Sequence, residues 1–238
     1  MALPKLTTPE YMITVPSTGE EIKFRPFLVK EEKVLLIALE TGDEAAINEA
    51  IMNIVKECTF GQSGYSTTPL FDIEYLFINV RGKSVGDLVK LSITCPDDNE
   101  TEVAVELGLD EIKVQVNDEH TNVIDLTDDI KMVMSYPTTQ TTKVVTSRRE
   151  GASETEATFD LLQACVAEIH DGDVIYNKSD ISSKEMTEFF DSMNNSQLEK
   201  INKFFETMPK VRHTIKVKNP KTKKTSEVIL EGLADFFG

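Results

Sequence analysis

The N-terminal part of the chain begins with a strand-like pattern. Apolar and polar residues alternate over 10–15 and again over 22–24, and the segment 16–19, Pro-Ser-Thr-Gly, supplies turn residues between them. Period-two alternation on both sides of a turn predicts a β-hairpin.

Helical spacing follows the hairpin. Apolar residues recur every three or four positions over 29–41 and over 44–58, and Gly42 interrupts the pattern. Asp43 stands where an N-cap of the second helix would stand. The sequence therefore predicts two helices joined by a tight turn.

The central part is mainly strand-like. The apolar run 71–80 is predicted to be a short buried helix, and a strand is the alternative because Ile and Val gather at its end. Strands are predicted over 88–95, 101–107, 111–117 and 130–136, which together indicate an antiparallel β region.

The segment 137–158 differs in composition from its surroundings, because seven of its 22 residues are threonine. Such a polar segment is typical of a mobile linker or of a polar insertion. It is the best candidate for a domain boundary. The expected domains are therefore 1–136, an N-terminal α+β domain, and 159–238, a C-terminal helical region with a terminal β-hairpin.

Helical spacing over 159–169 predicts a helix that ends near His170. Capping-box spacing at 182–185 and at 196–199 predicts the start of two more helices. Two alternating segments, 211–217 and 226–230, predict the final hairpin. The expected fold class is α+β: an N-terminal β-hairpin and helical hairpin, a central antiparallel β region, and C-terminal helices followed by a β-hairpin.

The chain closes on an apolar tail, Leu233, Phe236 and Phe237. We expect the tail to close the core. The alternative is that it anchors a partner protein.

The formal net charge of −16 argues against a general nucleic-acid binder, because phosphates would be repelled. It also argues against binding to anionic membranes. Residues 97–130 hold twelve acids and one lysine, whereas residues 209–225 hold seven basic residues and no acid. The two segments could attract each other within the fold or between copies, or each could meet a separate partner.

The three cysteines are too few for a disulfide framework, which indicates a reducing compartment. No apolar run has the ~18 residues of a membrane span, and the first ten residues do not resemble a signal peptide. We therefore expect a soluble protein made in a cytoplasm.

Two turns have the outline of a zinc-ribbon knuckle, Cys95-Pro96-Asp97-Asp98 and Asn219-Pro220-Lys221-Thr222. A structural zinc site needs four Cys or His ligands, and cysteine occupies only one of the four knuckle positions. Plain hairpins are the favoured interpretation, and no metal or other cofactor is predicted.

Catalytic motifs are weak or incomplete. Gly82-Lys83-Ser84 lacks the first glycine of a phosphate-binding loop. Asp171-Gly172-Asp173 is not followed by the ligands of a calcium loop. Cys165 and His170 are five residues apart and would lie on different faces of a helix. We therefore expect a protein that binds other proteins rather than an enzyme.

The C-terminal hairpin carries a run of lysines without interleaved aromatic residues, which favours a solvated hairpin over a nucleic-acid site. With the apolar tail it supplies the candidate partner-binding residues: Lys216, Lys218, Lys221, Phe236 and Phe237.

Seven segments, taken together, have an order and spacing that are more specific than any one of them alone. They are 1–6 (MALPKL), 15–19 (VPSTG), 24–33 (FRPFLVKEEK), 71–77 (FDIEYLF), 81–86 (RGKSVG), 203–210 (KFFETMPK) and 228–233 (VILEGL). In these segments the chain resembles the baseplate hub assembly proteins of T-even-like contractile-tailed bacteriophages. The resemblance covers most of the chain except 137–158.

The resemblance implies a late phage protein without enzymatic activity, needed to build the central hub of the tail baseplate. It implies other baseplate hub or tape-measure proteins as partners, and an oligomer is possible within that role. The expected location is the host cytoplasm during assembly, or the baseplate of the virion tail if the protein stays in the particle.

Overall fold

The computed structural model describes residues 6–148 and 153–237, which form two compact units. The first unit joins the chain up to Gln115 with the chain from Lys210 onward, and the second unit spans Val116–Pro209. The division differs from the predicted one, because both ends of the chain belong to one unit. A long-range strand pairing between the two segments of the first unit causes the difference, and local patterns do not reveal such a pairing.

The first unit begins with the predicted elements. β1 (Tyr11–Thr14) and β2 (Glu21–Phe24) form an antiparallel hairpin, and α1 (Val29–Thr41) and α2 (Glu44–Cys58) form the helical hairpin. The side chain of Asp43 accepts a hydrogen bond of 3.0 Å from the backbone N–H of Ala45, so it is the N-cap that the sequence predicts.

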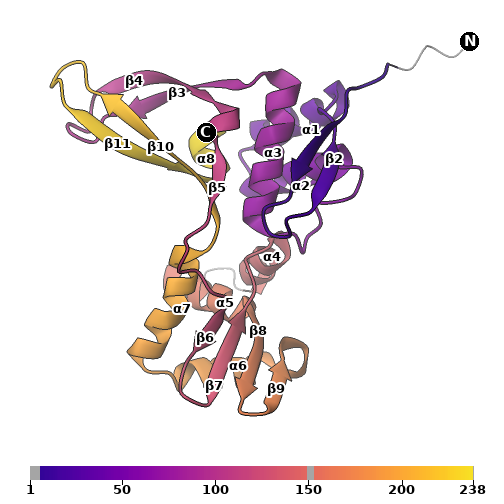
Figure 1. Cartoon of the computed structure of the whole chain (residues 1–238), viewed down its shortest axis with the longest axis vertical. Helices are drawn as coiled ribbons and strands as arrows, with labels where there is room; N and C mark the ends of the chain where they lie inside the picture. Colours follow the sequence, from indigo (N-terminus) through magenta and orange to yellow (C-terminus); the bar gives the residue numbers. More distant parts are fainter. Residues whose placement is uncertain (1–5, 149–152, 238) are drawn as a thin grey trace, which may run out of the picture. The chain divides into compact units, whose positions relative to one another are not determined.

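The apolar run after the second helix is helical, as predicted. α3 (Leu70–Val85) is buried on most of its sides, which explains why its sequence is apolar without a clear stripe. It lies beside α2 and the first hairpin (Figure 1). Their shared core consists of Ile13, Val15, Ile22, Phe24, Ile51, Ile54, Val55, Cys58, Ile73, Leu76, Phe77 and Val80.

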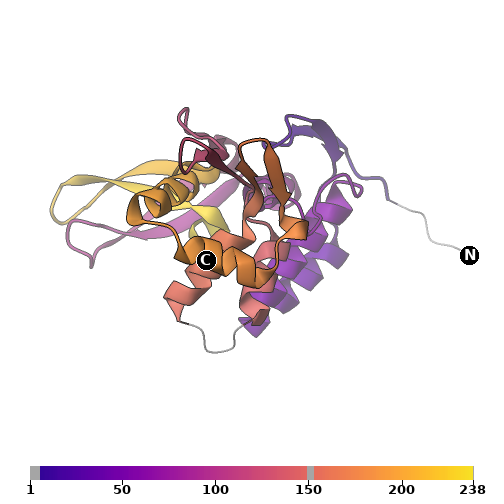
Figure 2. The ribbon, with the colours of Figure 1, turned by 90° about the horizontal axis from the view of Figure 1, so that it is seen from below.

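The rest of the first unit is two long hairpins and a final helix. β3 (Leu88–Thr94) pairs with β4 (Glu102–Gly108), and β10 (Lys210–Lys218) pairs with β11 (Thr225–Glu231). The two hairpins lie side by side in both views (Figure 1, Figure 2). β10 also pairs with β5 (Lys113–Gln115), and this pairing is one of the contacts that join the two segments of the unit. A 3-10 turn (Leu109–Glu111) precedes β5, and α8 (Gly232–Phe237) follows β11.

The second unit is a four-stranded antiparallel sheet covered by helices. Its strand order is β6 (Val123–Asp125), β7 (Ile130–Met134), β8 (Val166–Asp171) and β9 (Val174–Asn177). The helices are α4 (Thr139–Arg148), α5 (Glu154–Ala164), α6 (Ser183–Asp191) and α7 (Asn195–Thr207), and a 3-10 turn (Lys178–Asp180) precedes α6. The core lies between one face of the sheet and α5, α6 and α7; it contains Ile124, Leu126, Met132, Met134, Leu162, Cys165, Val166, Ile169, Met186, Phe190, Ile201 and Phe204.

The threonine-rich segment is largely helical rather than a linker. α4 and α5 occupy most of 137–158, and residues 149–152 lie outside the described residues. The Ser153 hydroxyl accepts a hydrogen bond from the Glu156 backbone, and the Glu156 carboxylate accepts one from the Ser153 backbone. This capping box starts α5 and offsets the poor helix propensity of the neighbouring threonines.

Two local predictions in the second unit are wrong. The helix expected to end near His170 ends at Ala164, and the residues after Cys165 form β8. Pairing with β7 on one side and β9 on the other overrides the helical spacing there. The second capping box is formed by Asn194 and Gln197 instead of Ser196 and Glu199, so the N-cap of α7 lies two residues earlier than predicted.

Candidate interaction surface

Helix α1 carries more exposed large apolar residues than any other described helix or strand. The exposed fractions are 80% for Val29, 51% for Val34, 53% for Leu36, 51% for Ile37 and 50% for Leu39. We call these five side chains the α1 surface. Exposed apolar patches on soluble proteins commonly mark sites of contact with other macromolecules.

The α1 surface faces outward because α1 packs on the rest of the unit through a narrow stripe. Glu31 and Ala38 are buried and Leu35 is partly buried, and α1 packs against α2. These three positions are four and three residues apart and therefore share one side of the helix. On a surface helix the opposite side is usually polar, whereas here apolar residues share it with Lys30, Lys33 and Glu40.

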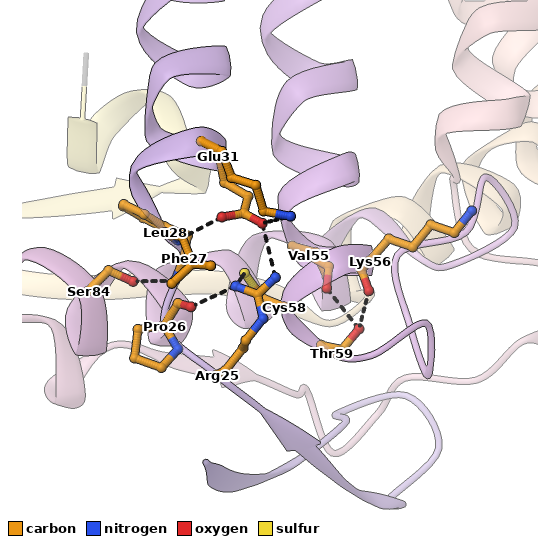
Figure 3. A network of polar contacts seen from close by, with 11 residues as sticks. Arg25, Pro26, Phe27, Leu28, Glu31, Val55, Lys56, Cys58, Thr59 and Ser84 are labelled. Atoms are coloured by element: carbon orange, nitrogen blue, oxygen red, sulfur yellow. Dashed lines mark hydrogen bonds and ion pairs between the residues drawn. The ribbon is translucent and has the colours of Figure 1, made fainter. Parts of the chain in front are cut away.

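A buried ion pair at the start of α1 fixes where the surface points. The Nη2 atom of Arg25, at the end of the first hairpin, lies 3.0 Å from Oε1 of Glu31 (Figure 3). Only 9% of Arg25 and 6% of Glu31 are exposed. The other Glu31 oxygen accepts a 2.7 Å hydrogen bond from the backbone N–H of Leu28, so the same carboxylate caps the helix.

Arg25 also contacts the end of α2 (Figure 3). Its Nη1 donates to the Pro26 carbonyl at 3.0 Å and lies 3.7 Å from the sulfur of Cys58, and its backbone N–H donates to the Cys58 carbonyl at 2.9 Å. Burial acts to raise the pKa of Glu31, but hydrogen bonds from Arg25, Leu28 and Lys30 outweigh burial and lower that pKa. Glu31 is therefore held ionised, and the hairpin, α1 and α2 are tied together.

The two turns with the outline of zinc knuckles meet in the first unit. Nδ2 of Asn219 lies 2.9 Å from a carboxylate oxygen of Asp97 and 2.9 Å from one of Asp98, and the Thr222 hydroxyl donates to Asp97. Asn219 is 0% exposed and Cys95 is 1% exposed. Hydrogen bonds between the two turns therefore join the tips of the β3–β4 and β10–β11 hairpins. We call this group the tip cluster.

Hydrogen bonds keep the two carboxylates of the tip cluster ionised. Hydrogen bonds from Thr101 and Asn219 lower the pKa of Asp98, and those from Thr222 and Asn219 lower the pKa of Asp97. Burial and the neighbouring carboxylates of Asp97 and Asp98 raise the pKa of the Cys95 thiol, so the neutral thiol is favoured at neutral pH. Within the described part of the chain, no group of three or more His, Cys, Asp or Glu residues could hold a metal ion.

The tip cluster leads to a prediction about stability. Replacing Asn219 by alanine is expected to lower the free energy of unfolding by about 1–3 kcal/mol, because two carboxylates lose a donor and two turn N–H groups lose their acceptor. Thermal unfolding followed by circular dichroism measures the loss. The exposed neighbour Lys221, changed to alanine, is the control and should change stability by less than about 0.5 kcal/mol. Equal melting temperatures for both variants would contradict the role of Asn219.

The predicted partner-binding residues lie partly on an exposed hairpin and partly in the buried C-terminal tail. Lys216, Lys218 and Lys221 are exposed on the β10–β11 hairpin, and Lys216 pairs with Glu227 at 3.5 Å. Phe236 is fully buried, and Phe237 is partly buried with its ring 6.1 Å from that of Phe77. The structure thus separates the lysines from the tail, and their role in binding partners stays a prediction.

Sequence reasoning missed a polar and aromatic cluster in the second unit. The ring nitrogens of His120 lie 3.0 Å from the Thr207 hydroxyl and 3.1 Å from the Tyr136 hydroxyl, and its ring packs against Phe204 at 5.1 Å. Burial lowers the pKa of His120. No spacing signal links three elements so far apart in sequence, so only the fold shows the cluster, which joins the loop before β6 to α7.

Burial also raises the pKa values of two cysteines and a glutamate among the described residues. Burial raises the pKa values of Cys58 and Cys165 to about 11, which disfavours both thiolates at neutral pH. Burial and the nearby Glu231 raise the pKa of Glu74 to about 7. An open depression of about 480 Å³ is lined by Arg25, Lys56, Glu57, Phe60 and Gly61, and neither of the two thiols nor Glu74 is among its lining residues.

Comparison with known proteins gives the family. The family model described as T4 bacteriophage base plate protein matches residues 8–238. The chain belongs to this family. The match includes the α1 surface and the tip cluster. It also spans the threonine-rich segment, for which the sequence resemblance offered no counterpart.

No curated protein and no solved structure matches the chain. Among the described residues, no helix has the length and apolar character needed to cross a membrane.

Proposed function

We propose that this baseplate-family protein is a non-enzymatic assembly factor of the phage tail baseplate hub. In this role it binds a hub or tape-measure protein, in the manner of a chaperone, until the hub is built. The α1 surface is the binding site in this proposal, and the exposure of its five apolar side chains is the observation that carries it.

Two features support the choice of the α1 surface. The helix is fixed at its start by the Arg25–Glu31 pair, so the surface is preorganised and little ordering free energy is lost on binding. Lys30, Lys33 and Glu40 lie among the apolar residues, so charges of both signs border the surface. A partner helix with an apolar stripe flanked by charged residues would fit such a surface.

Co-expression with the hub and tape-measure proteins of the same phage tests the proposal. The wild-type chain is expected to copurify with at least one of them. The double variant Leu36→Gln and Ile37→Gln should weaken the complex by about tenfold or more, because central apolar contacts dominate most interfaces. Glutamine keeps helix propensity high, so α1 itself should persist.

A matched control lies on the same helix. Lys33→Gln with Glu40→Gln leaves the net charge unchanged and should leave the complex within about threefold of wild type if apolar contact dominates. Equal loss in both double variants would contradict the α1 surface as the site. The absence of any complex, together with complete baseplates after deletion of the gene, would contradict the assembly role.

A second candidate is a resident structural subunit of the baseplate hub, and the family description, a base plate protein, supports a structural role as much as an assembly role. Mass spectrometry of purified tails separates the two. A resident subunit is present at a fixed ratio to other baseplate proteins, whereas an assembly factor is depleted from mature tails but present in assembly intermediates.

A further inference from the structure

Strand β9 differs from every other described strand because none of its four residues is buried or half-buried. Val174 is 50% exposed, Ile175 is 54% exposed and Tyr176 is 46% exposed, and Asn177 is also exposed. Three consecutive apolar residues are thus open to water on both faces of a strand. Natural sheets usually avoid such a strand at an edge.

β9 is the end strand of its sheet. The strand order places it next to β8 alone, and it is seen at the end of the sheet in Figure 1. Ile169 of β8 faces the core and is 7% exposed, whereas Tyr176, its partner on β9, is 46% exposed. The helices that cover β8 therefore do not cover β9.

The backbone of β9 also has unused pairing capacity. Asp171 and Val174 flank a two-residue turn, so they form a hydrogen-bonded pair. Hydrogen-bonded and non-hydrogen-bonded pairs then alternate along the β8–β9 ladder. Ile175 lies opposite His170 in a non-hydrogen-bonded pair. Its N–H and C=O therefore point away from β8, toward the open edge.

We propose that β9 pairs with β9 of a second copy of this chain, antiparallel and centred on Ile175, so that the two sheets become one sheet of eight strands. This pairing is independent of the proposed assembly role. It would remove the open edge from both copies, and two-fold symmetric contacts of this kind are the commonest form of self-association.

The register is self-complementary. With Ile175 opposite its own counterpart, Val174 of each copy lies opposite Tyr176 of the other, so apolar residues meet on both faces. Asp173 lies opposite Asn177 of the other copy, which keeps the two carboxylates apart. No close pair of like charges arises along the paired strands.

The proposed β9–β9 contact is small, and the net negative charge of the two copies opposes it. Four residues per copy bury less than the ~1,200 Å² of a standard interface, so a weak, concentration-dependent dimer is expected. The second unit has eighteen acids and eight basic residues, so two copies repel each other at long range. Raising the salt concentration screens this repulsion and should therefore tighten the dimer. Binding to a basic partner protein would show the opposite salt dependence and weaken.

Sedimentation equilibrium of the full chain, at about 50 mM and about 500 mM NaCl, tests the pairing. A monomer–dimer equilibrium that tightens with salt is expected. Ile175→Lys should raise the dissociation constant by at least about tenfold, because a charged edge strand resists pairing. Val85→Lys is the control, since Val85 is 60% exposed on α3 of the first unit, and it should leave the dimer unchanged.

Cysteine crosslinking tests the register. The native cysteines are all buried, so a single introduced cysteine dominates the reaction. Ile175→Cys should form a disulfide-linked dimer under mild oxidation. Asp173→Cys should not, because its counterpart would lie roughly 13 Å away along the strands.

Three results would overturn the proposal: a monomer at every concentration, a dimer unaffected by Ile175→Lys, or crosslinking through Asp173→Cys as fast as through Ile175→Cys. Unchanged circular dichroism of the Ile175 variants ensures that a loss of dimer is not a loss of fold. The assembly role is tested separately, since the α1 variants leave β9 intact.

Discussion

Replacing Arg25 by methionine is expected to destabilise the first unit by about 3–5 kcal/mol, the largest effect that we expect from a single polar residue. The substitution leaves the Glu31 carboxylate buried without its main partner, while methionine retains much of the apolar volume. The loss should exceed the net contribution of the ion pair, because removing one member of a buried pair leaves the other uncompensated.

The chain has no tryptophan, so unfolding is best followed by circular dichroism, with hydrogen exchange to locate the change. Exchange should rise in the first hairpin, α1 and the end of α2, and should be unchanged in the second unit. The control is Lys30→Met. Lys30 lies 3.1 Å from Glu31, but its own side chain is 66% exposed, so its loss should cost at most about 1 kcal/mol. A similar loss of unfolding free energy in Arg25→Met and Lys30→Met would contradict the idea that burial of the Arg25–Glu31 pair causes the large effect.

The same variant connects stability with the proposed function. If the Arg25–Glu31 pair orients α1, then Arg25→Met should weaken partner binding at temperatures where the chain is still folded. Circular dichroism at the binding temperature checks that condition.

The local elements of the first unit follow well from the sequence. The turn at 16–19, the breaker Gly42 and the cap Asp43 act over a few residues, so period and turn chemistry are sufficient to place the hairpin and two helices. The apolar run of α3 was also predicted, although its wide burial removes the stripe that would have distinguished it clearly from a strand.

Elements whose conformation depends on distant partners were not predictable. Val166 and Ile169 fit helical spacing, but β7 and β9 pair with this segment and make it β8. In the same way, the pairing of β10 with β5 places both ends of the chain in one unit. Sequence patterns report local preference, whereas these pairings depend on which strands meet after the chain folds.

The candidate site was predictable in part. The two knuckle outlines pointed to Cys95 and Asn219, and the structure brings the two turns together through hydrogen bonds instead of metal ligands. The α1 surface had no sequence signal of its own. Val34, Ile37 and Leu39 fit the helical spacing of core residues in the sequence, and only the narrow contact with α2 shows that they face outward.

The C-terminal helix gives the second large prediction: Phe236→Ala should lower the free energy of unfolding by about 3–5 kcal/mol. Phe236 is completely buried, so alanine would leave a cavity of most of a phenyl ring. Truncation after Gly232 should destabilise further, because it also removes Phe237, whose ring packs near Phe77 and lies 4.4 Å from the Arg81 guanidinium.

Phe236→Leu is the matched control, since it keeps much of the apolar volume and should cost less than about 1.5 kcal/mol. Thermal unfolding of the three variants, with partner binding measured in parallel, separates the two roles considered for the tail. If the tail has a core role, the melting temperature falls least in Phe236→Leu, more in Phe236→Ala and most in the truncated chain. Partner binding then stays intact at temperatures where the chain is folded. An anchor role would leave the melting temperature of the truncated chain unchanged and abolish binding. Because Phe236 has no exposed surface to offer a partner while α8 stays in place, we expect the first outcome.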